Sequence, residues 1–170
     1  MTLPKGWKNE QKSSSSTNEQ KSSSSTNEQK SSSSTITMND KMVIQELIAK
    51  YNLAIDNKNI DEWTNTWIDD GIWTTTFGEA KGKTELKNMV NQITSEFASG
   101  KRHVSTNIVI EAATNGMASA KSYLTVIEAQ RSPEVVATGI YSDTLKKDAS
   151  GKWKFLQRKL DIDLVNESRK

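Results

Sequence analysis

The chain has 170 residues, of which 34% are hydrophobic and 26% charged, and its formal net charge is +2. This length suffices for one modest domain with its own hydrophobic core. With no cysteine and a single histidine, the sequence excludes a disulfide framework, and a zinc site would have to consist largely of carboxylates.

The first part of the chain is a repeat without hydrophobic residues. Residues 9–35 read NEQKSSSST three times, and no unit offers an apolar side chain to a core. Such a segment cannot bury enough surface to offset the entropy of ordering it. We therefore predict that residues 1–38 form a disordered, serine-rich tail.

Charge and hydropathy limit the partners of the remaining chain. Residues 1–39 hold five lysines and three glutamates, which leaves 18 basic and 18 acidic residues elsewhere. A neutral domain without a basic cluster does not favour nucleic acid as a partner. The opening MTLPKGWKNEQK lacks the apolar run of a secretory signal, and no segment approaches the roughly 20 apolar residues that span a bilayer. We predict a soluble, cytoplasmic protein that binds neither membranes nor nucleic acids.

Helical patterns occupy the first half of the predicted domain, residues 39–165. In MNDKMVIQELIAKYNLAID, apolar residues recur at helical spacing, and Asn39 or Asp40 is expected to cap the helix. The segment IDEWTNTWID predicts a second, short helix with Trp63 and Trp67 on one face. GIWTTTF is typical of a short strand, and residues 83–97 predict a third helix.

The second half of the predicted domain is a run of strands. Alternation predicts strands at residues 102–112, 117–129, 135–146 and 152–164, joined by turns at TNG, RSPE and DASG. Helices followed by long strands indicate an α+β domain, in which helices pack on one face of a curved antiparallel sheet. Residues 166–170 would form a short C-terminal tail. A curved sheet closed by helices leaves an internal cavity that suits a small molecule.

Two polar residues stand out on the predicted strands. On the last strand, Arg158 shares its face with apolar residues, and a guanidinium there needs either a structural carboxylate or a ligand. These apolar residues are Leu156, Leu160, Ile162 and Leu164. The only histidine, His103, lies in GKRHVSTN, and alternation puts it with Ser105 and Asn107, opposite the face of Val104, Thr106, Ile108 and Ile110. His103 would then face solvent, a polar pocket or a subunit interface, and alternation does not choose among them.

The usual cofactor motifs do not occur in the sequence. It has no H-E-x-x-H pair, no calcium-loop series, no G-x-S-x-G elbow, and no G-x-G-x-x-G or Walker-type loop. Two kinds of function remain, which are acid–base chemistry without a cofactor or metal, and binding without chemistry.

Several segments together carry a family resemblance. YNLAIDNKNIDEW, WIDDGIW, KGKTELKNMV, RHVSTN, GIYSDTL and GKWKFLQRKLDID resemble the SnoaL-like domains of the nuclear transport factor 2-like (cystatin-like α+β) superfamily. The pattern is most similar to the branch of scytalone dehydratase, bile acid 7α-dehydratase and hexachlorocyclohexane dehydrochlorinase. This resemblance implies a cone with an internal cavity and a lyase that needs no cofactor.

The resemblance also implies which residues act. The family's Asp/His dyad falls on Asp56 and His103, its pocket arginine on Arg158, and the dehydratase-type tyrosine on Tyr51. The dehydrochlorinase has a lysine where this chain has Tyr51, and this chain has no second histidine, so dehydration fits better than dehalogenation. His103 would remove a proton, and Tyr51 and Arg158 would assist the leaving group or a developing negative charge.

Two alternatives stay open at this point. The cavity walls and substrate contacts would come from Trp63, Trp67, Trp73, Phe77, Asn107 and Tyr141, although such aromatic residues also serve as plain core. The same fold also serves as an isomerase or cyclase, or as a binding or dimerisation module without catalysis. A homodimer or homotrimer is expected, because relatives associate through the outer face of the sheet.

One local feature opposes the dyad. On a regular helix Asp56 lies roughly 150° from the centre of the apolar stripe, which would point its carboxylate away from the core. The dyad therefore requires the first helix to end near Asp56, before Asn57 and Asn59. Asp143 has no assigned role from sequence.

Overall fold

The computed structural model describes residues 35–96 and 100–165. The predictions for the repeat in residues 1–34, for residue 97 and for the C-terminal tail fall outside these residues.

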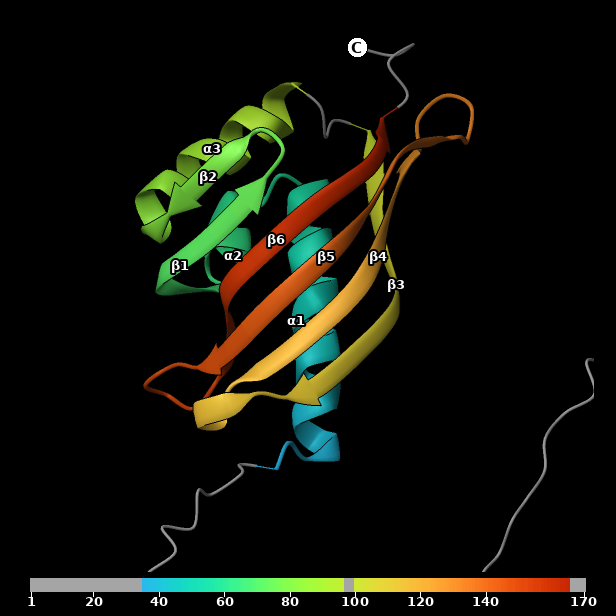
Figure 1. Ribbon diagram of the computed structural model, residues 1–170. Helices are drawn as coiled ribbons and strands as arrows, with labels where there is room; N and C mark the ends of the chain where they lie inside the picture. The colour runs from blue at the N-terminus through green and yellow to red at the C-terminus, as the bar shows by residue number, and fades with distance from the viewer. Residues whose placement is uncertain (1–34, 97–99, 166–170) are drawn as a thin grey trace, which may run out of the picture. The chain divides into compact units, whose positions relative to one another are not determined.

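Three helices and six strands make up the fold. The helices are α1 (Met38–Asp56), α2 (Ile60–Thr64) and α3 (Gly82–Glu96). The strands are β1 (Trp67–Thr75), β2 (Gly78–Lys81), β3 (Lys101–Ala112), β4 (Ala118–Glu128), β5 (Val135–Lys147) and β6 (Trp153–Val165), with a short 3-10 turn, η1 (Thr114–Gly116), between β3 and β4. One curved sheet has the order β2-β1-β6-β5-β4-β3, and α1 lies along one face of it (Figure 1). The predicted α+β fold is confirmed.

The sheet differs from the prediction at its first strands. Strand β1 pairs with β6 in parallel, whereas every other pairing is antiparallel, and β2 was not predicted. The prediction that Trp67 lies on a helix is wrong, because Trp67 begins β1. The backbone N–H of Phe155 donates to the carbonyl of Thr66 at 2.9 Å, which draws the chain beside β6 directly after α2.

The start of α1 is held by a capping box rather than by the predicted caps. Thr37 is the N-cap: its hydroxyl accepts from the backbone N–H of Asp40, and the Asp40 carboxylate accepts from the backbone N–H of Thr37. Asp40 also accepts from Trp153 Nε1 at 2.7 Å and pairs with Lys147 at 2.9 Å. Asp40 thereby joins the beginning of α1 to β5 and β6.

The end of α1 meets the condition that the dyad requires. Lys58 has a left-handed backbone (φ 55°), its N–H donates to the carbonyl of Ile55 at 3.1 Å, and the N–H of Asn59 donates to that of Ala54 at 2.8 Å. These two bonds form a Schellman motif, which stops the helix although the left-handed residue is not glycine. Asp56 is consequently the last residue of α1.

A bulge in β3 reverses the predicted alternation. Thr106 pairs with Tyr123 but Val109 pairs with Lys121, so β3 contains one extra residue where Asn107 has φ 53°. Before the bulge, His103 faces Asp56 of α1, and Ser105 shares that face. After it, the apolar Ile108 and Ile110 take the inner face and Asn107 the outer one.

Two bulges also alter the face of β6. The register with β5 shifts at two places, and at each of them β6 contains one extra residue, Leu156 at one and Asp163 at the other. Arg158 therefore shares the inner face with Leu160 and Ile162, as predicted, whereas Leu164 is 67% exposed. The prediction that Leu156 and Leu164 belong to this face is wrong, because each bulge shifts the alternation by one residue.

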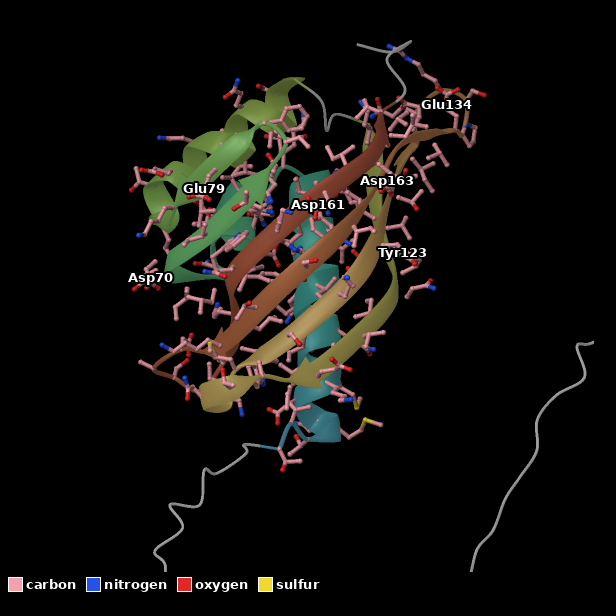
Figure 2. All side chains as sticks on the ribbon, in the orientation of Figure 1. Asp70, Glu79, Tyr123, Glu134, Asp161 and Asp163 are labelled. Atoms are coloured by element: carbon pink, nitrogen blue, oxygen red, sulfur yellow. The ribbon has the colours of Figure 1, made fainter. Side chains whose placement is uncertain are left out.

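Aromatic rings fill the core between α1 and the sheet. The Tyr51 ring lies 5.2–6.5 Å, centroid to centroid, from five other rings. These belong to Trp63, Trp67, Trp73, Tyr141 and Phe155. The opposite face of the sheet is mixed in character, and Figure 2 labels two of its exposed side chains, Tyr123 on β4 and Asp161 on β6. Of the helices in the described residues, none has the length and hydropathy to cross a membrane.

Candidate functional site

The carboxylate of Asp56 holds His103 through both its backbone and its ring. Asp56 Oδ1 lies 2.6 Å from His103 Nδ1, and the two carboxylate oxygens accept from the backbone N–H of His103 at 3.2 and 3.1 Å. The side chains are 4% and 7% exposed, respectively. Three contacts to one carboxylate determine both the position and the rotation of the imidazole.

This contact assigns different roles to the two ring nitrogens. A carboxylate accepts hydrogen bonds, so Nδ1 is the nitrogen that carries the proton, and Nε2 of a neutral ring keeps its lone pair. Asp56 engages only Nδ1, and the ring lines a small cavity. In this arrangement Nε2 is the ring nitrogen that can accept a proton.

The cavity has a volume of about 50 Å³ and is almost wholly apolar. Besides His103, it is lined by Ile55, Trp73, Thr75, Phe77, Ile93, Leu124, Val126, Ala137, Thr138, Tyr141, Leu160, Ile162 and Val165. Trp73, Phe77 and Tyr141 thus line the same cavity as His103. Phe77 is 69% exposed in the turn between β1 and β2, so it lies at the edge of this cavity.

Three predicted substrate contacts lie elsewhere. Trp63 and Trp67 pack in the aromatic core beside Tyr51 and do not line the cavity. Asn107 lines a broad hollow on the outer face of the sheet, because the bulge in β3 turns it away from His103. The geometry therefore separates these residues from the imidazole.

Arg158 lies in a second, sealed pair. Its Nε and Nη2 donate to the two carboxylate oxygens of Asp143 at 2.9 and 3.1 Å, and both side chains are 0% exposed. The guanidinium carbon lies 3.8–4.3 Å from the ring centroids of Tyr51, Tyr141 and Phe155. Arg158 is thus paired with a structural carboxylate, which is one of the two alternatives predicted from the sequence. Aromatic rings enclose its side chain.

Burial affects the ionisation of this second pair. Burial raises the pKa of Asp143 above its ordinary value, even with a guanidinium beside it. Burial lowers the pKa of Arg158, but the charge of Asp143, its hydrogen bond and the two neighbouring tyrosines together outweigh this, so that pKa is raised. Arg158 stays a cation, and its Nη1 has no acceptor within residues 35–96 and 100–165.

The two interior tyrosines differ in their relation to the cavity. Burial raises the pKa of both Tyr51 and Tyr141, so both phenols stay protonated at neutral pH. Tyr141 lines the cavity together with His103, whereas Tyr51 lies behind it in the aromatic core. Of the two tyrosines, Tyr141 therefore shares the cavity with the imidazole, and the geometry does not bring Tyr51 to it.

Sequence reasoning missed several residues of the site. Thr75 and Thr138 also line the cavity, and Asn52 donates to Ser105 at 2.9 Å beside the dyad. Asn52 precedes Asp56 by one helical turn and Ser105 follows His103 on the same strand face, so this spacing could have revealed the second contact. Within the described ranges, no group of three or more acidic, histidine or cysteine side chains could hold a metal ion.

The fold and site together define a class: α+β cone domains with an Asp–His pair at an internal apolar cavity. A family model for the SnoaL-like domain matches residues 37–159, and the chain belongs to this family. Among curated proteins, no sequence matches this chain.

Solved structures agree with this assignment. A Nostoc punctiforme protein of unknown function with a cystatin-like fold is 31% identical, with a TM-score of 0.71 over 76% of this chain and 95% of its own. A Novosphingobium aromaticivorans protein provisionally described as a scytalone dehydratase is 22% identical, with a TM-score of 0.66 over 76% of this chain and 88% of its own. LinA is 18% identical, with a TM-score of 0.67 over 76% and 89%. At these last two identities the likeness concerns the fold.

Proposed function

We propose that this protein is a cofactor-independent lyase that eliminates a small leaving group from a neutral, hydrophobic or ring-bearing substrate. The observation that carries the proposal is the 2.6 Å contact between Asp56 and Nδ1 of His103, at the wall of an apolar cavity. The resemblance to scytalone dehydratase supports an elimination of water.

The reaction begins with proton removal. Nε2 of His103 takes a proton from a carbon beside an electron-withdrawing group, and the carboxylate of Asp56 stabilises the imidazolium that forms. The electron pair of the broken C–H bond forms the new double bond, and the C–O bond to the leaving hydroxyl breaks. A general base in such a position contributes about 10²- to 10⁴-fold to the rate.

The leaving hydroxyl needs a proton to depart as water. Tyr141 lines the cavity and its phenol stays protonated, so we assign it this donation. The imidazolium then returns its proton to the phenolate, directly or through water, which restores both groups. Where nothing leaves, the same proton abstraction gives an isomerisation.

The lining of the cavity supports a neutral substrate. In the described part of the chain, the buried cation is Arg158, which is already paired with Asp143 and enclosed by aromatic rings. Among the described residues that line the cavity there is therefore no lysine or arginine to pair with a carboxylate or phosphate. Since a volume of about 50 Å³ cannot admit a ring, entry requires displacement of a wall residue, and the exposed Phe77 is the one we assign.

The test is a screen for elimination with hydroxylated ketones, steroids and small aromatic lactones. We expect one class to yield an alkene with loss of water, and His103→Ala to lower kcat by about 10²- to 10⁴-fold. Arg102→Ala is the matched control, because Arg102 is exposed on the neighbouring position of β3. Turnover that survives in His103→Ala would remove the proposed base.

Binding without catalysis is the alternative. In that case the same ligands bind, His103→Ala changes their affinity, and no product forms. Association of subunits through the outer face of the sheet stays a prediction, which sedimentation of the full chain tests.

A further inference from the structure

A second polar contact joins α1 to β3 beside the Asp–His pair. Nδ2 of Asn52 donates to Oγ of Ser105 at 2.9 Å. Asn52 is 6% exposed, so this contact lies in the packed interface between helix and sheet. The proposed reaction gives neither residue a task.

The two contacts have matching spacing. Asn52 and Asp56 are four residues apart on α1, which is an advance of about 6 Å along a helix. Ser105 and His103 are two residues apart on β3, which is about 6.8 Å along a strand. Both contacts therefore join α1 to β3 with the same spacing, and both require the same register of the helix on the strand.

Strand β3 needs such a contact more than the other long strands do. It lies at the edge of the sheet and pairs only with β4, and its pairing is interrupted by the bulge after Thr106. A shift of α1 by one residue would rotate Asp56 by about 100° away from His103. The position of the dyad thus depends on how α1 is placed against this edge.

Stability alone does not explain the Asn52–Ser105 contact. Oδ1 of Asn52 is buried and has no hydrogen-bond partner in the described part of the chain. A buried acceptor without a partner costs free energy, whereas an apolar pair of the same shape would not. A polar pair in such a place is better explained by the register it specifies.

We propose that Asn52 and Ser105 are positioning residues, which hold α1 on β3 so that Asp56 reaches both the backbone and Nδ1 of His103. This inference rests on the proposed function in one respect, because that function gives the Asp56–His103 pair its catalytic purpose. The positioning itself is measured without a substrate.

The experiment uses the imidazole ¹H–¹⁵N spectrum of the full chain, prepared without a histidine tag. Because His103 is the only histidine, every imidazole signal belongs to it. In Ser105→Ala and in Asn52→Ala we expect the single Nδ1-protonated form to become a mixture of tautomers. We also expect hydrogen exchange of the His103 amide to become roughly fivefold faster, since its bond to Asp56 weakens.

Two further variants separate positioning from general stability. Ser105→Thr keeps the hydroxyl, so it should restore the wild-type spectrum. Trp153→Phe removes the bond to Asp40 at the far end of α1, so it should lower stability and leave the His103 signals unchanged.

Wild-type signals in both Ser105→Ala and Asn52→Ala would overturn the proposal, as would an equal change in Trp153→Phe. A wild-type spectrum without a protonated Nδ1 would also overturn it, because there would be no dyad to position. Failure to find an elimination changes none of these spectra, so the two failures are distinguishable.

Discussion

The interior of this domain contains two pairs of ionisable side chains, Asp56 with His103 and Asp143 with Arg158. In both, a carboxylate accepts hydrogen bonds from a nitrogen base at 2.6–3.1 Å with little exposure to solvent. They differ in access, because the imidazole lines a cavity while the guanidinium is enclosed by three rings. Access therefore separates the pair that we propose for catalysis, whose imidazole lines the cavity, from the pair whose side chains are 0% exposed.

The largest expected effect concerns the sealed pair. Arg158→Met should lower the free energy of unfolding by about 3–5 kcal/mol, because it leaves Asp143 buried without its partner. The double variant Arg158→Met, Asp143→Leu should recover most of this loss, since it buries no charge. Denaturant titration measures both.

The control for this variant is Lys83→Ala, which removes an ion pair to Asp69 at the surface. Its expected cost is about 0–1 kcal/mol, because exposed pairs contribute little. If Arg158→Met cost no more than Lys83→Ala, the sealed pair would not support the fold.

The second effect concerns the pair at the cavity. Asp56→Ala should cost about 1–3 kcal/mol, because it leaves the backbone N–H of His103 without an acceptor in a nearly buried place. The loss should be smaller than for Arg158→Met, since no full charge is left unpaired. Equal losses in the two variants, compared by denaturant titration, would contradict the distinction between the pairs.

A third effect concerns the other end of α1 and its dependence on pH. A hydrogen bond from Thr37, with further ones from Trp153 and Lys147, holds the pKa of Asp40 below its ordinary value of 3.8. A carboxylate with a lowered folded-state pKa contributes stability above its ordinary pKa and loses it as the pH falls further. The Tm should therefore drop between roughly pH 4 and pH 2, and Asp40→Asn should flatten that drop. An unchanged slope in Asp40→Asn would contradict this assignment.

The smallest expected effect on stability concerns the edge of the cavity. Phe77→Ala should change the free energy of unfolding by less than about 0.5 kcal/mol, because the ring is mostly exposed. It should nevertheless speed the binding of a large hydrophobic probe, such as an anilinonaphthalene sulfonate dye, measured by stopped-flow fluorescence. Slower or unchanged binding would contradict the role of Phe77 in entry.

Much of the fold is readable in the sequence, because the strands of the second half alternate strongly. The predicted bounds of β3 and β5 differ from the observed ones by one residue at one end. The failures arise where one residue changes the geometry: the bulges at Asn107 and Leu156 shift every following side chain, and alternation alone does not reveal a bulge.

The candidate site was predictable only in part. Asp56 and His103 come together because Lys58 ends α1 in a left-handed conformation, which the Asn-rich segment suggested. The sealing of Arg158 depends on Asp143, its register partner on the adjacent strand β5, and local sequence does not reveal a pairing register of this kind. The residue types therefore indicated which side chains are acids or bases. The tertiary packing decided which of these side chains line a cavity.

The tautomer of His103 shows whether Asp56 orients the imidazole as proposed. In the ¹H–¹⁵N spectrum of the neutral imidazole of the wild-type chain, we expect a protonated Nδ1 and an unprotonated Nε2, with the Nδ1 signal lost in Asp56→Ala. A neutral ring protonated at Nε2, or a spectrum that Asp56→Ala leaves unchanged, would contradict the proposal that Asp56 prepares His103 as a base.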